Sequence, residues 1–219
     1  MNEITAGYCS DDVCRMLAKI SEKIKENVDL LAHLDGLSGD GDLGETMGKS
    51  ADAMIEAAAA CDKDADIGLL LMKVAMAMNK AAPSTLGTLL SCAVMAVAKK
   101  TKGRTMLYPA DVIAIPGIMA SEIQERGGAS LGDKTILDAL IPMSEAVLAE
   151  FDKWSYEEDE RLKSAYHSGA LAARQGADNT ASMIPKAGRA QWIGERVRDN
   201  LDGGAVLCAI VSELFLLRH

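Results

Sequence analysis

The most informative stretch of this chain joins its first two predicted helices and reads Asp35-Gly36-Leu37-Ser38-Gly39-Asp40-Gly41-Asp42, continuing as Leu43-Gly44-Glu45-Thr46-Met47. Carboxylates this close together repel one another unless a positive charge lies between them. The glycines allow the backbone to bring them together, because glycine accepts a positive φ at no steric cost. The stretch has no His or Cys, and ligands that are all oxygen favour a hard cation such as Mg²⁺ or Ca²⁺. The candidate metal ligands are Asp35, Asp40 and Asp42.

The same stretch also has a purely structural interpretation. Asp35 followed by Gly36 fits a helix end, and Asp42 with Glu45 three residues later fits a helix N-cap with its capping-box partner. Spacing excludes two specialised loops. An EF-hand needs an oxygen ligand where Gly44 stands, and an aspartyl-phosphate loop needs threonine there. The metal site and the simple turn both remain open at this point.

Length and composition indicate one helical domain. The chain has 219 residues, of which 49% are hydrophobic, enough for one sizeable core. Aromatic residues make up only 4%, and the abundance of alanine, leucine and methionine favours helix packed on helix. We therefore expect a single domain over residues 1–219. The formal charge of −9 argues against nucleic acid as a partner, although it is compatible with a nucleotide that brings its own Mg²⁺.

The cysteines and the apolar segments indicate a cytoplasmic protein. Five cysteines are scattered without a C-x-x-C pair, so we expect neither a zinc site nor a disulfide framework. The N-terminus has no recognisable signal segment. No uninterrupted apolar stretch reaches the roughly 18 residues that a membrane span needs, so no membrane association is expected.

Apolar residues recur at spacings of three and four almost throughout the chain, a pattern typical of amphipathic helices. This pattern predicts helices over about 10–34, 43–60, 66–81, 85–101, 109–126, 133–152, 156–175, 189–199 and 204–217. The joints between them are short and rich in Gly or Pro, which forces consecutive helices to run antiparallel. The expected fold is an all-α, antiparallel up-and-down barrel or bundle of about eight helices.

In such an array every second joint lies at the same end. The joints at 35–42, 82–85, 127–132 and 180–189 can therefore meet, and the helix N-termini there favour phosphate. Each joint taken alone has a plainer interpretation. Ser84 or Thr85 fits a simple helix cap, and so does Asp133. Arg189 fits either a phosphate contact or a solvated side chain.

Taken together, these motifs resemble the nucleotide-binding L subunit of the dihydroxyacetone kinase family. The resemblance covers nearly the full length of the chain. It rests on Leu34-Asp35, Gly39 to Asp42, Met47, Gly87-Thr88, Gly132 to Thr135, Lys186 to Arg189, Gly194 to Arg196 and Asp202 to Ala205.

The resemblance implies an eight-helix barrel that binds a nucleotide at one end. Asp35, Asp40 and Asp42 would hold two Mg²⁺ ions against the phosphates. The implied nucleotide-binding residues are Leu43, Gly44, Glu45, Thr46, Ala82, Ser84, Thr85, Gly127, Ile136, Arg189, Asp202, Gly203 and Gly204. The implied activity is that of a phosphotransferase acting on a small ketose or triose, with ADP as a fixed coenzyme or ATP as the donor.

The resemblance also implies partners. None of His33, His167 and His219 lies in a motif, and the family holds its substrate on a histidine of a separate K subunit, so we expect such a partner chain. If ADP is a fixed coenzyme, a phosphotransferase-system phosphocarrier protein would rephosphorylate it. A homodimer is compatible with the sequence.

Three departures from the family pattern stand out. Leu43 replaces the usual histidine, Ala82-Pro83-Ser84-Thr85 replaces a Gly-rich turn, and Asp202-Gly203-Gly204 replaces Asp-Pro-Gly. None of them touches the three candidate metal ligands. Loss of the histidine leaves an alternative function open, that of a non-catalytic nucleotide-binding regulatory subunit.

Overall fold

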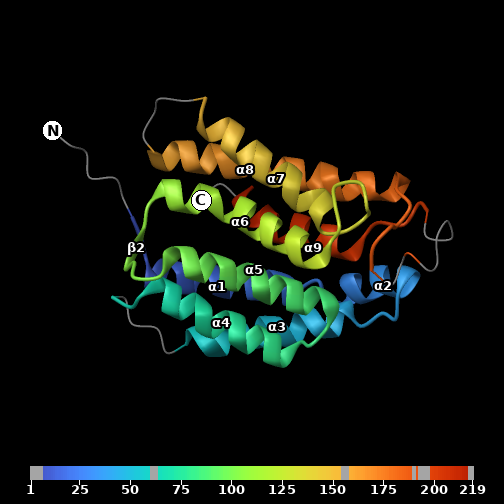
Figure 1. Ribbon diagram of the computed structural model, residues 1–219, viewed down its shortest axis with the longest axis horizontal. Helices are drawn as coiled ribbons and strands as arrows, with labels where there is room; N and C mark the ends of the chain where they lie inside the picture. The colour runs from blue at the N-terminus through green and yellow to red at the C-terminus, as the bar shows by residue number, and fades with distance from the viewer. Residues whose placement is uncertain (1–6, 60–63, 154–157, 189–190, 192–197, 217–219) are drawn as a thin grey trace.

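The chain forms an array of antiparallel helices in the computed structural model, which describes residues 7–59, 64–153, 158–188, 191 and 198–216. Figure 1 shows the long helices running side by side. Their bounds are α1 Ser10–Lys25, α2 Val28–Ser38, α3 Leu43–Ala58, α4 Ile67–Ala81, α5 Thr85–Thr101, α6 Pro109–Gly127, α7 Leu137–Phe151, α8 Glu158–Asn179 and α9 Gly203–Ser212. The described residues also include strands β1 (Tyr8–Cys9) and β2 (Met106–Leu107) and 3-10 turns η1 (Thr180–Ser182) and η4 (Glu213–Phe215). The predicted all-α fold is confirmed.

Contacts between helices close the array into a barrel. α1 packs on α3, and packing then follows the chain order from α3 through α9. α9 also contacts α1, so the ring closes through eight helices of the described part of the chain. α2 lies outside this order and contacts α3 and α9. It is therefore a short extra helix that covers one end of the barrel.

The core consists of two adjoining apolar clusters. One includes Leu31, Met47 and Leu137, which are at most 1% exposed, and the other includes Ile67 and Val74, which are fully buried. Burying a side chain of this size contributes about 1.5–3 kcal/mol, so the apolar face of each helix fixes its place in the ring. None of the helices in the described ranges combines the length and apolar character that crossing a bilayer requires.

Several helix boundaries differ from the sequence prediction. The predicted helix over 10–34 breaks after Lys25 and resumes at Val28, and it continues past Leu34 to Ser38. α7 begins at Leu137 rather than at Asp133. α8 extends beyond its predicted end to Asn179, and the last helix ends at Ser212, where η4 takes over. The predicted helix over 189–199 falls mostly outside the described residues.

The predicted meeting of alternate joints is visible in the fold. Figure 1 places the α2–α3, α4–α5 and α6–α7 joints and the segment before α9 at the right-hand end of the barrel. The short β1–β2 ladder, in which Tyr8 pairs with Leu107, lies at the opposite end. The first end therefore collects the loops that carry the candidate site residues.

Candidate functional site

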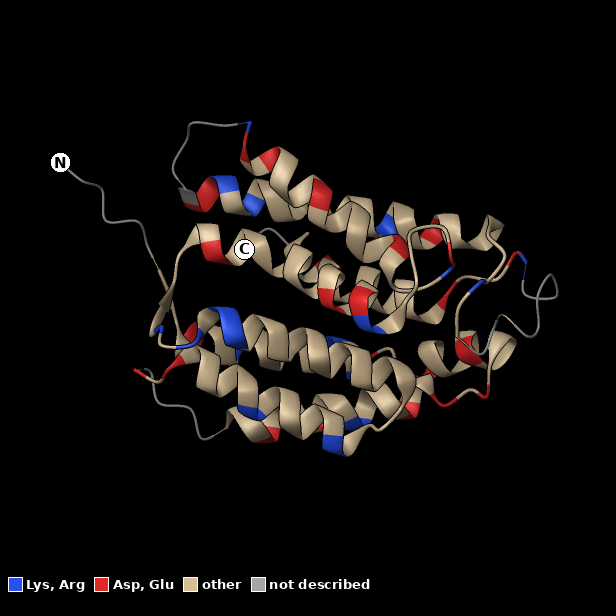
Figure 2. Ribbon diagram, viewed as in Figure 1, with Lys and Arg blue, Asp and Glu red and all other residues tan. Residues whose placement is uncertain are grey.

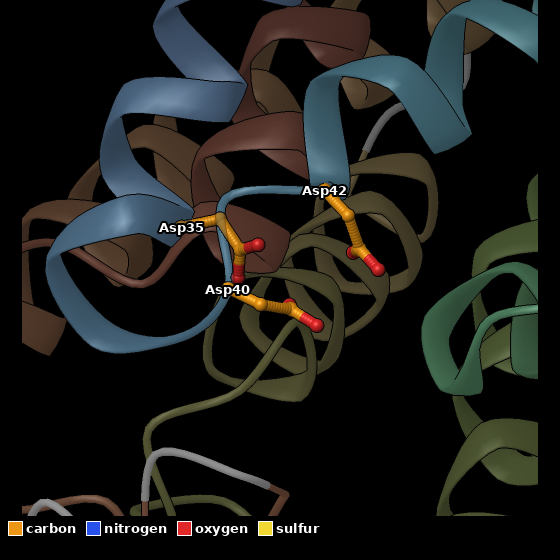
Figure 3. Close-up of side chains that lie close together, drawn as sticks. All are labelled: Asp35, Asp40 and Asp42. Carbon is orange, nitrogen blue, oxygen red and sulfur yellow. The ribbon is translucent and has the colours of Figure 1, made fainter.

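Three aspartates converge at the joint between α2 and α3. Asp35 lies in the last turn of α2, Asp40 follows the Gly39 that ends this helix, and Asp42 immediately precedes α3. Each residue offers a carboxylate oxygen, and these oxygens lie within 4.8 Å of one another (Figure 3). Gly41 between them has a φ of +78°, a left-handed conformation that glycine adopts without strain and that lets the chain reverse. Figure 2 shows acidic residues along this joint.

Contacts with the backbone fix the carboxylate of Asp35. The N–H of Leu43 donates a hydrogen bond to Asp35 Oδ2 at 3.3 Å. A Cβ atom on Gly39 would lie 2.9 Å from Asp35 Oδ1, so a larger residue there would have to displace the carboxylate from its present position. The start of α3 and the end of α2 thus position the first candidate ligand.

The two capping interpretations of the acidic stretch are wrong. α2 continues through Gly36 to Ser38, so Asp35 does not end a helix. Asp42 occupies the N-cap position of α3, but its side chain makes no capping hydrogen bond among the described residues. Glu45 does not close a capping box; it pairs with Lys49 at 2.5 Å, and this hydrogen bond lowers the pKa of Glu45. With these two caps excluded, the convergence of three carboxylates stays compatible with a metal site.

The donor set fits a hard divalent cation. All three candidate ligands are carboxylates; Asp35 is half-buried, whereas Asp40 and Asp42 are exposed. Mg²⁺ is usually held by one or two carboxylates and completes its octahedron with water and phosphate oxygens. A cluster that is anchored on one side and open to solvent on the other suits such an ion.

The start of α9 lies directly beside the acidic cluster. A Cβ atom on Gly203 would lie 2.7 Å from Leu43 Cδ2 and 4.0 Å from the backbone nitrogen of Asp35. A Cβ atom on Gly204 would lie 3.3 Å from the Cβ of Ile136. The structure therefore brings together five residues of the sequence prediction, which come from the α2–α3 joint, the start of α9 and the residue before α7.

Leu43, which replaces the family histidine, belongs to the core. It is 7% exposed and forms part of the larger apolar cluster. Its contact with Gly203 explains why an apolar side chain fits here. Thr46 is also buried, at 9% exposure. Gly44 faces the backbone of α2, since a Cβ atom there would lie 2.1 Å from Val28 O.

The turn before α5 has the architecture of a helix cap. Ser84 Oγ accepts a hydrogen bond from the N–H of Gly87 at 3.0 Å, whereas Thr85 is exposed and Ala82 is buried. Gly127 ends α6, where a Cβ atom would lie 3.3 Å from a methyl group of Leu89 on α5. The α4–α5 joint and the end of α6 lie at the same end of the barrel as the α2–α3 joint (Figure 1).

Asp202 is an acidic residue with an unusual environment at the start of α9. Its Oδ1 accepts a hydrogen bond from the N–H of Ala205 at 2.7 Å and so caps α9. Its own N–H donates to Thr180 Oγ1 at 2.9 Å. Burial raises the pKa of Asp202 to about 7. Arg189, the predicted phosphate contact, lies outside the described residues.

The sequence analysis did not select Asp138 or Lys134 as site residues, although both lie in or beside the loop before α7. Asp133 does not start a helix; its carboxylate accepts the N–H of Ser130 within the loop. The buried Asp138 organises the same loop from α7 by accepting the N–H groups of Gly132 and Thr135. Lys134, between these two residues, is buried at 4% exposure. The run from Gly132 to Thr135 was the only sequence signal for them.

Comparison with known proteins gives the family. The DAK2 domain matches residues 38–216 of this chain. The chain belongs to the DAK2 domain family. The resemblance to the L subunit of dihydroxyacetone kinase is confirmed, since the ADP-binding subunit DhaL of the PEP-dependent dihydroxyacetone kinase of Escherichia coli is 25% identical over 94% of this chain and 95% of that subunit.

Larger kinases also contain a similar region. The D-erythrulose kinase of Mycolicibacterium smegmatis is 34% identical over 91% of this chain, which spans about a third (34%) of that relative. The crystal structure of the dihydroxyacetone kinase from C. freundii in complex with AMP-PNP and Mg²⁺ has a TM-score of 0.69 and 21% identity, over 92% of this chain and 32% of that one. At this identity the structural match shows a shared fold.

Proposed function

We propose that this chain is the nucleotide- and Mg²⁺-binding subunit of a kinase for dihydroxyacetone or a similar small ketose. The observation that most directly supports this proposal is the cluster of three aspartates beside the start of α9. Carboxylate oxygens of Asp35, Asp40 and Asp42 lie within 4.8 Å of one another. The relatives support the same role, since one is a kinase subunit described as ADP-binding. The solved kinase with the same fold contains AMP-PNP and Mg²⁺.

Each part of the site has a role in this proposal. The aspartates would hold two Mg²⁺ ions, which neutralise phosphate charge when bound. Backbone N–H groups at the starts of α3 and α9 would face the phosphates, where helix N-termini favour negative charge. Apolar Ile136, beside the start of α9, would border the base together with Gly127. Arg189 would reach the phosphates or the ribose.

The proposed chemistry needs a substrate-binding unit besides the candidate site. The described residues offer carboxylates and backbone donors for a nucleotide, while the candidate site contains no histidine that could hold a ketose. A K-type subunit would therefore bring the substrate to the open side of the aspartates. The phosphate donor would be ATP, or a phosphocarrier protein that recharges a permanently bound ADP.

A matched pair of variants tests the metal assignment. Asp40→Asn removes one candidate ligand, and Asp29→Asn makes the same charge change on the exposed surface of α2. Titration calorimetry with ADP in excess Mg²⁺ should show affinity at least ~10-fold weaker for Asp40→Asn, because losing a ligand costs more than ~1.4 kcal/mol. Asp29→Asn should stay within about twofold of the wild type. Equal affinity for Asp40→Asn and the wild type would refute the metal site.

A further inference from the structure

The loop before α7 contains a lysine in an unusual environment. Lys134 is 4% exposed, although lysine is almost never fully buried unless it is paired. Its φ is +61°, in the left-handed region that non-glycine residues rarely adopt. Both features are unfavourable alone, so other contacts must maintain them.

Hydrogen bonds on both sides of Lys134 maintain its backbone conformation. The carboxylate of Asp138, 1% exposed, accepts the N–H of Gly132 at 2.6 Å and the N–H of Thr135 at 2.8 Å. Asp133 accepts the N–H of Ser130 at 2.8 Å. A strained residue persists only where its surroundings over-determine it, and such residues concentrate at functional sites.

The side chain of Lys134 links three segments at the nucleotide end. Its Nζ donates a hydrogen bond to Met183 O at 3.2 Å, in the segment 183–188 that follows η1. It also interacts electrostatically with the carboxylates of Asp199 and Asp202. Asp202 caps α9 and has Asp138 as a second acidic neighbour. The ammonium of Lys134 thus attracts the carboxylate of Asp202, which Asp138 repels.

We infer that Lys134 is a positioning residue, whose buried ammonium neutralises Asp202 and fastens the segment 183–188, so that the loop before α7 and the start of α9 keep the spacing that the nucleotide requires. This inference rests on the proposed function and adds a supporting residue to the same site. Lys134 acts through Asp202 and Met183, and the metal ligands are on a different joint.

Lys186 supplies a matched control. It connects the same two loops, since its Nζ lies 3.2 Å from Gly132 O and 3.5 Å from Asp133 Oδ1. Unlike Lys134, its side chain is 65% exposed, where ion pairs are screened and contribute little. If a contact between the two loops were all that nucleotide binding requires, Lys134→Met and Lys186→Met would lower the affinity for ADP to a similar extent.

The first measurement is affinity for ADP with excess Mg²⁺ at about pH 8, where Asp202 is ionised. We expect Lys134→Met to bind at least ~10-fold more weakly than the wild type, and Lys186→Met to remain within about twofold. Wild-type affinity in Lys134→Met, or equal losses in both variants, would overturn the inference.

The second measurement removes the charge that Lys134 neutralises. Asparagine caps a helix as well as aspartate does, so Asp202→Asn deletes the charge and keeps the cap of α9. The double variant Lys134→Met/Asp202→Asn should recover at least ~3-fold of the lost affinity and show a higher urea midpoint than Lys134→Met without nucleotide. If Lys134→Met fails to fold, the double variant should still fold.

A double variant no better than Lys134→Met in either measurement would refute charge neutralisation, because a merely structural lysine gives no such rescue. The urea midpoints do not depend on nucleotide. Absence of binding by the wild-type protein would therefore refute the proposed function, while the midpoints alone would still decide whether Lys134 neutralises Asp202.

Discussion

At the scale of single residues, some side chains of the site could be predicted from the sequence and others could not. The three aspartates are visible in the sequence because glycines separate them in one short stretch. Asp138 and Lys134 are not, since an Asp in a first helical turn and a Lys in a polar loop normally face solvent. Only the loop geometry, with Lys134 at a φ of +61° and Asp138 turned back toward Gly132, buries both.

The raised pKa of Asp202 predicts how stability depends on pH. Its pKa is about 7 in the folded protein, whereas an unperturbed aspartate has a pKa of 3.8. Between these two pH values the folded state therefore binds more protons than the unfolded state. The stabilisation from this proton is complete at low pH and is lost as pH rises toward about 7. Relative to Asp202→Asn, the wild-type free energy of unfolding should fall by roughly 1–2 kcal/mol between about pH 5.5 and pH 8.5, after discounting for partial exposure.

Urea denaturation of both proteins across this pH range measures the difference. Other titrating groups are common to both, so their effects cancel. A constant difference between wild type and Asp202→Asn would show that the folded protein leaves the pKa of Asp202 unchanged.

At the scale of secondary structure elements, the site depends on how closely α2 and α3 cross. In Gly44→Ala the new Cβ would lie 2.1 Å from Val28 O and 2.9 Å from Ala32 Cβ. A helix backbone cannot yield as a flexible side chain can, so α2 must move away and take Asp35 with it. We expect a loss of about 1–3 kcal/mol in the free energy of unfolding and weaker Mg²⁺-dependent nucleotide binding.

Gly48→Ala, one turn further along α3, is the matched control. A Cβ there would lie 3.4 Å from Val28 Cγ1, an ordinary contact, and alanine favours a helix over glycine by about 1 kcal/mol. Gly48→Ala should therefore be neutral or stabilising in thermal and urea denaturation. Equal destabilisation by both variants would argue against a specific role for the close crossing at Gly44.

The helices themselves were largely predictable, because apolar spacing determines which face is buried. The boundaries next to the site were not. Gly36 looked like a helix end, but α2 continues through it to Ser38, and a Cβ atom on Gly36 would lie 3.9 Å from the Cα of Gly41 in the turn that follows. Asp133 looked like a helix start, yet Asp138 draws the N–H groups of Gly132 and Thr135 into a loop and delays α7 to Leu137. Both errors arise from contacts between residues that a local pattern cannot show.

At the scale of the whole molecule, closure of the ring explains why distant loops share one end. α9 completes the barrel by packing against α8 and α1, which brings Gly203 and Gly204 beside residues over 60 positions earlier in the chain. The sequence predicted that alternate joints meet, from antiparallel order alone. It could not predict the contact of Gly203 with Leu43, which depends on closure and on the extra helix α2.

Reconstitution distinguishes the proposed kinase subunit from a nucleotide-binding regulator. This chain spans about a third of the D-erythrulose kinase it matches and nearly the whole of the E. coli ADP-binding subunit, so the assay supplies the substrate-binding subunit separately. We expect the purified chain, a K-type subunit and dihydroxyacetone to yield phosphorylated ketose from ATP or from a phosphocarrier system.

Asp40→Asn should reduce this transfer at least ~100-fold, because Mg²⁺ neutralises the charge that develops on the transferred group. Asp29→Asn, with the same net charge, should retain it. Product is measured by coupled assay or by ³¹P NMR. A wild-type chain that binds nucleotide and the K-type subunit yet transfers nothing from either donor would identify a regulator, and the buried Leu43 in place of a histidine would then be the first position to restore.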